Sequence, residues 1–247
     1  MNNVIGSNTG RRPARSAGTS LWLGITGISL AIAGSYGSGQ DFWPFTIGLL
    51  MVAVAFLLGA IGGLSGLFAL IRNRSGSGLG RRITIGLLLC GVVLAGVGPW
   101  IYRGVSLPPI HDVTTDLANP PAFASLPMRK DNLAGIESLD QWRELHRKAY
   151  GDIAPITLRM TPEAAIARAQ TLATERGWTI ALGAAGRLEA TDTVSPFKFK
   201  DDVVILATPT PDGQSTIINM RSVSRVGASD FGINAKRTRE FMAAFQK

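Results

Sequence analysis

Three apolar stretches without a charged side chain dominate the first half of the sequence, at residues 16–40, 42–71 and 83–102. A helix needs about 20 consecutive apolar residues to span the hydrocarbon core of a bilayer. The second and third stretches meet this requirement comfortably, and the first is shorter and less apolar. Three such stretches close together are not expected of buried helices in a soluble protein. We therefore predict a transmembrane region at residues 19–103, a three-helix anchor with spans at about 19–39, 43–71 and 83–102.

The first stretch also fits a cleaved signal peptide. A basic tail precedes it, and Ala31-Ile32-Ala33 resembles the small-residue pattern of a cleavage site. Either interpretation leaves the final topology the same and changes only the number of retained helices.

The net charge of the chain is unevenly distributed. The formal charge of +8 would by itself suggest a polyanionic partner such as nucleic acid. Residues 1–103, however, hold eight basic residues and one acid, a net charge of +7, while residues 104–247 hold 17 basic residues and 16 acids, a net charge of +1. A nearly neutral second half disfavours nucleic-acid binding. Positive charge concentrated in an apolar half is typical of a membrane protein, whose partner is the lipid bilayer.

The positions of the arginines predict how the anchor is oriented. Arg11, Arg12 and Arg15 lie in the N-terminal tail. Four arginines lie in the link between the second and third stretches, whereas the first link has none. Loops rich in Lys and Arg stay on the cytoplasmic side. We therefore expect a cytoplasmic tail at residues 1–18 and an extracytoplasmic domain at residues 104–247. In a Gram-negative cell this is a multi-pass inner-membrane protein with a periplasmic domain.

Glycines on the second stretch are spaced for close helix packing. Gly59 with Gly63, and Gly62 with Gly66, form two overlapping GxxxG spacings, which let helices approach closely. Glycine is common in membrane helices, so composition is the first explanation of the pattern. Packing among the three stretches is the second explanation, and self-association is the third.

No Asp, Glu, Lys, Arg or His lies within a span. Because ion and proton pathways usually need such groups, this argues against a transporter or pump.

The second half of the sequence has an ordinary soluble composition. Its clearest helix is 162–176, where Thr161 is a good N-cap and Pro162 fits the first helical position. Few regular elements are expected before residue 137. Short links between adjacent strands favour an α+β domain, with an antiparallel sheet of about four strands and helices packed on one face. The other expected elements are helices at 137–150 and 232–246, and strands at 178–182, 187–194, 202–208 and 215–221.

The segment IHDVTTD, residues 110–116, holds the first group of candidate functional residues. His111, Asp112 and Asp116 lie in a short stretch just after the anchor. A carboxylate–imidazole set can bind a metal or act as acid and base. Asp and Thr in loops also satisfy backbone groups as turns or caps. Both interpretations stay open, and because the spacing matches no established metal motif we assign no metal.

A second group lies in KDD, residues 200–202, and in RSVSRVGASDFGINAKR, residues 221–237. Basic residues surround a Ser/Gly-rich turn that leads into a helix, which makes a plausible site for an anion or carboxylate. The alternative is a structural network of cross-strand ion pairs with a helix cap at Ser229 or Asp230. The candidate residues of this group are Asp201, Asp202, Arg221, Ser224, Arg225, Ser229, Asp230, Asn234 and Arg237.

Four ordered segments of the second half resemble a known family. They read IHDVTTDLANPPAF, AYGDIAP, FKFKDDVVI and RSVSRVGASDFGINAKR. In this order and spacing they are similar to the family called domain of unknown function 1499, over about residues 105–247. In that family we expect Pro where Gly151 stands, Arg where Leu206 stands and Leu where Phe231 stands. The resemblance implies a membrane-associated protein and assigns no mechanism.

The two groups carry no catalytic signature. The sequence has no GxSxG, HExxH or P-loop motif, and no GxGxxG followed by a ribose-binding acid, so no cofactor is assigned. We expect a non-catalytic, membrane-anchored periplasmic domain that binds an envelope component or a partner protein. One alternative is a hydrolase-like or metal-assisted envelope enzyme, which requires the two groups to meet. Another is an accessory subunit of a larger membrane complex. No oligomeric state follows from the sequence.

Overall fold

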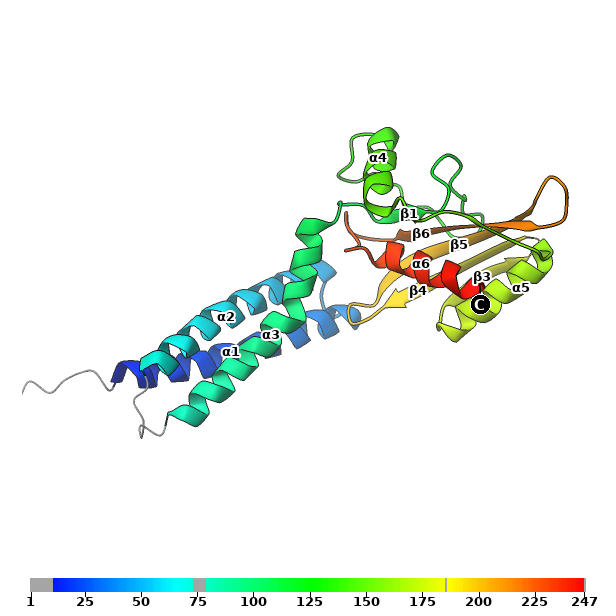
Figure 1. The fold of residues 1–247 in the computed structure, drawn as a ribbon. Helices are drawn as coiled ribbons and strands as arrows, with labels where there is room; N and C mark the ends of the chain where they lie inside the picture. The colour runs from blue at the N-terminus through cyan, green and yellow to red at the C-terminus, as the bar shows by residue number, and fades with distance from the viewer. Residues whose placement is uncertain (1–10, 73–78, 185, 247) are drawn as a thin grey trace, which may run out of the picture. The chain divides into compact units, whose positions relative to one another are not determined.

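The computed structural model describes residues 11–72, 79–184 and 186–246. The chain divides into two compact units, Met1–Tyr102 and Arg103–Lys247 (Figure 1). Arg74, one of the arginines on which the predicted orientation depends, lies outside the described residues, as do the first ten residues of the predicted cytoplasmic tail.

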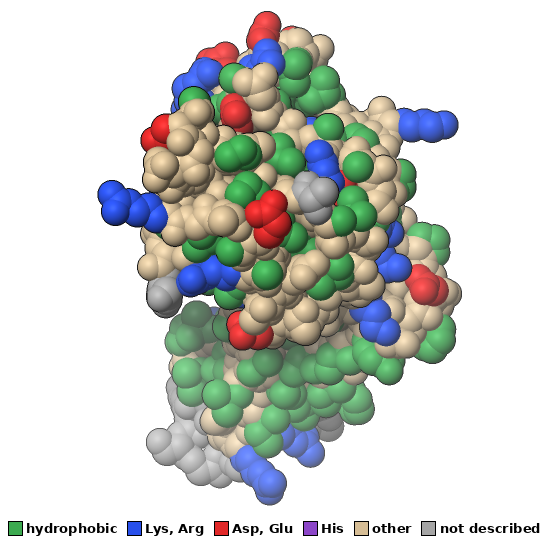
Figure 2. Space-filling model, turned by 90° about the vertical axis from the view of Figure 1, so that its right-hand side faces the viewer, with side chains coloured by type: hydrophobic (Ala, Val, Ile, Leu, Met, Phe, Trp, Pro, Cys, Tyr) green, Lys and Arg blue, Asp and Glu red, His purple; other side chains and the backbone are tan. Residues whose placement is uncertain are grey.

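The first unit consists of long helices, namely α1 (Arg11–Gly39), α2 (Phe45–Arg72) and α3 (Gly80–Ser106), the last of which continues into the second unit. Each of the three is long and apolar enough to cross a membrane. Large apolar side chains face outward, among them Leu64 with 71% and Leu88 with 64% exposure, and hydrophobic side chains dominate the helical surface visible in Figure 2. Such a surface needs an apolar environment. The three predicted apolar helices are confirmed.

The glycines of α2 are used for packing inside this unit. A Cβ atom at Gly62 would lie 2.6 Å from Sγ of Cys90 on α3, and one at Gly66 would lie 2.6 Å from Oγ of Ser20 on α1. A Cβ at Gly63 would lie 3.9 Å from its nearest neighbour, Cβ of Cys90. The buried glycines let the three helices approach closely, which favours packing among the three stretches as the reason for the GxxxG pattern.

The second unit is an α+β domain built on a six-stranded antiparallel sheet. The strands of this sheet are β1 (Asp112–Thr114), β2 (Ile156–Leu158), β3 (Thr179–Ala184), β4 (Arg187–Val194), β5 (Phe199–Pro209) and β6 (Thr216–Ser224). Their order is β1-β6-β5-β4-β3, and β2 also pairs with β6. The predicted α+β class is confirmed, and the four predicted strands correspond to β3, β4, β5 and β6. Its own helices are α4 (Leu139–Tyr150), α5 (Pro162–Glu175) and α6 (Ile233–Phe245).

The sheet is larger than predicted because two short strands share one edge of β6. Asp112 of β1 is opposite Val223 near the end of β6, and Ile156 of β2 is opposite Ile218 near its beginning. The nine residues of β6 therefore hold β1 and β2 one after the other. Each added strand has three residues, too few to show an alternating pattern, so the expectation of few regular elements before residue 137 missed β1.

One face of the sheet, the helix face, packs against α5 and α6 (Figure 1). Val203 and Ile205 of β5 are fully buried there beside Phe241 of α6. The ring of Phe241 stacks on Trp178 with 5.0 Å between the ring centroids. Because side chains alternate along a strand, the neighbours of these residues point to the opposite face, which we call the polar face.

Helix α4 covers the free edge of β1. Trp142 donates from Nε1 to the Asp112 carbonyl at 3.0 Å, and the backbone N–H of Thr114 donates to Nε2 of His146 at 3.1 Å. Burial lowers the pKa of His146 to about 4, so the imidazole is neutral near pH 7 and can accept this bond. The helix begins after Ser138, whose Oγ accepts from the N–H of Gln141. An edge covered in this way is protected from pairing with another chain.

An irregular segment, residues 117–135, covers the polar face and is called the strap below. Three backbone N–H groups of the strap bond to Glu189 on β4. Arg221 on β6 donates to the carbonyl of Pro121, and Arg129 of the strap donates to the carbonyls of Ser224 and Gly227. The strap therefore takes the place on this face that helices occupy on the other.

Candidate functional site

The two groups of candidate residues meet at the junction of β1 and β6. Asp112 and Arg221 form an ion pair with Nε–Oδ1 and Nη2–Oδ2 distances of 2.9 and 2.6 Å. Both side chains are buried, with 2% and 13% exposure. Asn132 of the strap donates to the same Asp112 carboxylate at 2.5 Å. The antiparallel register of β1 and β6 creates this contact, because it places Asp112 next to the end of β6.

A second ion pair lies further along the polar face. Arg225 donates from Nε and Nη2 to the two carboxylate oxygens of Asp202, both at 2.8 Å. Thr191 on β4 donates its hydroxyl to Oδ1 of Asp202 at 2.7 Å and accepts from Nη2 of Arg225 at 3.1 Å. This bonding stabilises the cationic form and raises the pKa of Arg225. A paired, hydrogen-bonded Asp202 is a poor acid or base for catalysis.

The polar face also contains Glu189, which the sequence interpretation missed. Its carboxylate accepts from the backbone N–H groups of Ala124, Ser125 and Leu126 at 2.6, 2.8 and 2.8 Å, and Arg187 lies 3.2 Å away. Burial alone would raise the pKa of Glu189, but these donors outweigh it and lower the pKa. Glu189 is therefore an anchor for the strap.

The remaining members of the second group lie on the helix face, around Arg237 of α6. This guanidinium has 6% exposure and lies 2.7 Å from Asp201 and 2.8 Å from Asp192. It also donates to Oγ of Ser222 at 3.0 Å and to the side-chain oxygen of Asn234. Adjacent residues on a strand point to opposite faces, so Asp201 and Asp202 belong to different networks.

Asn234 connects α6 to both β1 and β6. Its side-chain amide donates to the carbonyl of His111 at 3.0 Å and to Oγ of Ser224 at 2.9 Å. Ser222 donates to its carbonyl oxygen at 2.6 Å. Asn234 is fully buried, and these contacts join α6 to β6 and to the residue just before β1. Its role in this geometry is to hold the helix against the sheet.

Ser229 and Asp230 shape the start of α6. Ser229 Oγ accepts from the N–H of Phe231 at 3.3 Å, and the Asp230 carboxylate accepts from the N–H groups of Gly232 and Asn234 at 2.8 and 2.7 Å. Burial raises the pKa of Asp230, and the nearby charge of Asp201 adds to the effect. The N-cap residue of α6 is Gly232; Asp230 still accepts from the first helical turn, whereas Ser229 accepts from Phe231, ahead of the helix.

His111 and Asp116 do not join the ion pairs through their side chains. The Oδ1 atom of Asp116 accepts from the N–H groups of Ala118 and Asn119, both at 2.9 Å, as in a turn. Nδ1 of His111 lies 3.2 Å from the carbonyl oxygen of Ala228. Within the described ranges no three His, Cys, Asp or Glu side chains are grouped in a way that could hold a metal ion.

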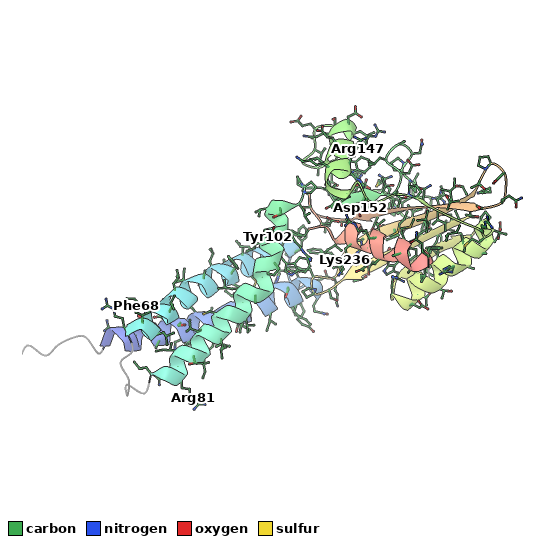
Figure 3. All side chains as sticks on the ribbon, viewed as in Figure 1. Phe68, Arg81, Tyr102, Arg147, Asp152 and Lys236 are labelled. Carbon is green, nitrogen blue, oxygen red and sulfur yellow. The ribbon has the colours of Figure 1, made fainter. Side chains whose placement is uncertain are left out.

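A hollow opens on the surface beside α6. Its lining includes the ion pair of buried Arg237 with half-buried Asp192, and the largely buried ring of Trp178. Lys236, which points outward from α6 in Figure 3, and Arg176 supply exposed cations, while Glu240 supplies an exposed acid. The hollow thus offers both signs of charge next to an apolar surface. Its lining residues are Arg176, Trp178, Asp192, Thr193, Val194, Ile233, Lys236, Arg237 and Glu240.

Comparison with known proteins identifies the second unit. Comparisons with curated proteins and with solved structures gave no match. The family model described as "Protein of unknown function (DUF1499)" matches residues 112–245, which is more than half of the chain and includes every element from β1 to α6. The sequence resemblance is thereby confirmed, and the chain belongs to the DUF1499 family.

Proposed function

We propose that this protein is a membrane-anchored binding domain rather than an enzyme, and that it binds an envelope component or a partner protein. The observation that carries the proposal is the pairing of the candidate acids and bases with one another. Asp112, Asp202 and Asp201 are each held by an arginine at 2.6–2.8 Å. Carboxylates held in this way stabilise the domain and are not free to transfer protons.

The same geometry weakens the enzyme hypothesis. That hypothesis uses His111, Asp112 and Asp116 together with the Arg/Asp set of the second group. The two groups meet through Asp112 and Arg221, but the side chains of His111 and Asp116 do not take part in that contact. Asp112 and Asp202 share the polar face beneath the strap, whereas the ring of His111 contacts Ala228.

The hypothesis of an accessory subunit depends on the GxxxG spacing. Gly62 and Gly66 are occupied in packing against α1 and α3 of the same chain.

The hollow beside α6 is the place where we expect the ligand to bind. It combines the largely buried ring of Trp178 with exposed groups of both charges at Lys236 and Glu240. A ligand that fits this lining is polar, carries both charges and has an apolar part. Binding sites in proteins typically combine apolar surface with a few placed polar groups in this way.

The proposed placement of this domain is outside the cytoplasmic membrane. The support is the distribution of charge, with arginines in the first turns of α1 and around the link between α2 and α3, and none between α1 and α2. Three crossings then put residues 104–247 on the far side, which is the periplasm of a Gram-negative cell. Arg81 and Tyr102 lie near opposite ends of α3 in Figure 3, as this orientation requires.

Native mass spectrometry of the full chain, extracted from its own membranes in detergent, tests the proposal. We expect a bound molecule at a fixed stoichiometry. Thr193→Trp places a large side chain at the rim of the hollow and should reduce occupancy at least tenfold. Thr157→Trp on β2 is the matched control, since Thr157 is also exposed on a strand but does not line the hollow. A ligand that Thr193→Trp retains, or substrate turnover that Arg225→Ala abolishes, contradicts the proposal.

A further inference from the structure

The turn between β4 and β5 lies at the end of the sheet from which the chain continues to α3. The pairs Asp112↔Val223, Asp201↔Ser224 and Val194↔Phe199 place the start of β1, the end of β6 and the β4–β5 turn at the same end. Figure 1 shows this turn, in yellow, at the end of the sheet where β1 begins. We call this the proximal end. The β5–β6 turn, residues 210–215, lies at the opposite end.

The short connection limits how far the proximal end can be from the membrane. Asp112, at the start of β1, follows six positions after Ser106, at the end of α3. Even a fully extended chain of that length reaches only about 20 Å. Leu107 also packs into the core of the second unit with Ile110 and Val113. Three strand spacings from β1 to β4 add about 14 Å sideways, so chain connectivity sets an upper limit on how far the β4–β5 turn can lie from Ser106.

The composition of the turn suits a lipid surface. Phe197 and Phe199 stack with 5.1 Å between ring centroids and an interplanar angle of 1°, and both are half-buried. Pro196, Lys198 and Lys200 are exposed around them. Aromatic and basic side chains together are favourable at the boundary between lipid headgroups and acyl chains.

The charge at the proximal end is positive on its exposed surface. Residues 194–200 and 225–229 contain two lysines and one arginine and no acid. The adjacent Asp201 and Asp202 are buried and paired with Arg237 and Arg225. The net positive charge of this surface therefore comes from Lys198 and Lys200. Asp131 of the strap is exposed, but it is paired at 2.8 Å with Arg129, which also bonds to the carbonyl of Gly227.

The opposite end of the sheet provides the contrast. The β5–β6 turn reads TPDGQS, with an acid at Asp212 and no Lys or Arg. Its Asp212 carboxylate accepts from Thr210 Oγ1 and from the N–H of Gln214, so the turn is closed by its own polar groups. A stacked Phe pair with two adjacent lysines is therefore present in the β4–β5 turn and absent from the β5–β6 turn, although Arg187 and Arg159 also lie at the opposite end of the sheet.

We propose that the β4–β5 turn, residues 194–200, rests on the surface of the membrane that α3 crosses, with its phenyl rings at the interface and Lys198 and Lys200 against anionic headgroups. The inference depends on α3 spanning the membrane, which is part of the proposed function. The contact holds the sheet at a fixed height above the lipid. It also adds a charge-dependent attachment to the one that the helices supply.

Lipid quenching of site-specific fluorophores tests this contact in the full chain. Variants in a Cys90→Ala background carry one cysteine each, at Ser195 in the β4–β5 turn, Gln214 in the β5–β6 turn or Leu88 in α3. The labelled proteins are reconstituted in nanodiscs of phosphatidylcholine and phosphatidylglycerol that contain nitroxide-labelled acyl chains. We expect severalfold stronger quenching at Ser195 than at Gln214. Equal quenching at these two positions overturns the proposal.

The Leu88 probe separates this inference from the proposed function. Strong quenching at Leu88 shows that α3 lies in lipid, so that weak quenching at Ser195 then counts against the turn contact alone. Weak quenching at Leu88 itself contradicts the membrane anchor. Leu88 is suitable because its side chain points outward with 64% exposure.

Charge reversal tests the role of the lysines. Lys198→Glu with Lys200→Glu should reduce quenching at Ser195 in phosphatidylglycerol nanodiscs, since each basic residue near an anionic surface contributes about fivefold to the contact. Arg147→Glu with Arg159→Glu makes the same change in net charge at exposed positions on α4 and after β2, and should leave quenching unchanged. A contact that survives the lysine reversal overturns the proposal.

Discussion

Asp112 on β1 and Arg221 on β6 are diagonal neighbours on the polar face and form two parallel hydrogen bonds of 2.9 and 2.6 Å. The pair joins the first strand after α3 to a strand more than a hundred residues later in the chain. A two-bond contact between guanidinium and carboxylate fixes geometry as well as charge. Because β1 has only three residues, this side-chain contact supplements a short ladder of backbone bonds.

Breaking this pair should destabilise the domain strongly. Arg221→Ala leaves the buried Asp112 carboxylate without its partner, and loss of one member of a buried pair costs about 3–5 kcal/mol. Urea unfolding of the full chain in detergent, followed by near-ultraviolet circular dichroism, measures the free energy of unfolding. Glu240→Gln removes an exposed pair with Lys236 and should change it by less than about 1 kcal/mol. Equal effects of the two variants would contradict a structural role for Asp112.

His146 should make stability depend on pH in mildly acidic solution. Its pKa is 6.5 in the unfolded chain and about 4 in the folded protein because of burial. Between these values the unfolded state binds more protons, so stability is complete above about pH 6.5 and falls as the pH decreases toward 4. The full effect is about 3 kcal/mol. Unfolding of His146→Gln should show a flatter profile in this window, and an unchanged profile would mean that another group titrates there.

The Glu189 carboxylate should control the order of the strap. Glu189→Gln replaces an acceptor of three backbone N–H groups by an amide that also carries donors. Leaving buried N–H groups unsatisfied costs about 1–3 kcal/mol. Hydrogen exchange at residues 124–126 should accelerate in this variant and stay unchanged in Glu163→Gln, an exposed residue in α5. Slow exchange in Glu189→Gln would show that other contacts hold the strap.

Adjacent glycines on α2 should differ sharply in their tolerance of a methyl group. Gly62→Ala places a Cβ 2.6 Å from Cys90 Sγ, whereas Gly63→Ala places one 3.9 Å from its nearest neighbour. Overpacking of this kind typically costs 1–3 kcal/mol, so the thermal midpoint in detergent should fall for Gly62→Ala only. A fall for Gly63→Ala alone would place the packed face of α2 on its other side.

The sequence predicted the elements whose patterns are long or well capped. The strand over Arg187–Val194 has its predicted bounds, and the helix that begins at Pro162 has the predicted cap at Thr161. The three apolar helices follow from length and composition alone. The strands β1 and β2 were missed because three residues show no period, and they form only because β6 offers a partner edge.

The candidate site was predicted by residue type but not by arrangement. The sequence placed Asp201 and Asp202 in one group, whereas strand alternation sends them to opposite faces. The predicted strand began at residue 202 and left Asp201 outside it, whereas β5 begins at Phe199 and contains both residues. Glu189 was missed because its partners are backbone N–H groups of an irregular segment, which have no signature in side-chain sequence. The alternation of Glu189 with the buried Leu188 and Ala190 on β4 was the one available signal.

Both proposals require residues 104–247 and the arginine-rich link to lie on opposite sides of the membrane. Labelling of single cysteines with a membrane-impermeant maleimide, in a Cys90→Ala background, tests this directly in cells whose outer membrane has been permeabilised. We expect Gln214→Cys, in the β5–β6 turn, to react while the inner membrane is intact. Arg81→Cys, at the start of α3, should react only after lysis. Reaction of Arg81→Cys in intact cells with protection of Gln214→Cys would contradict the account.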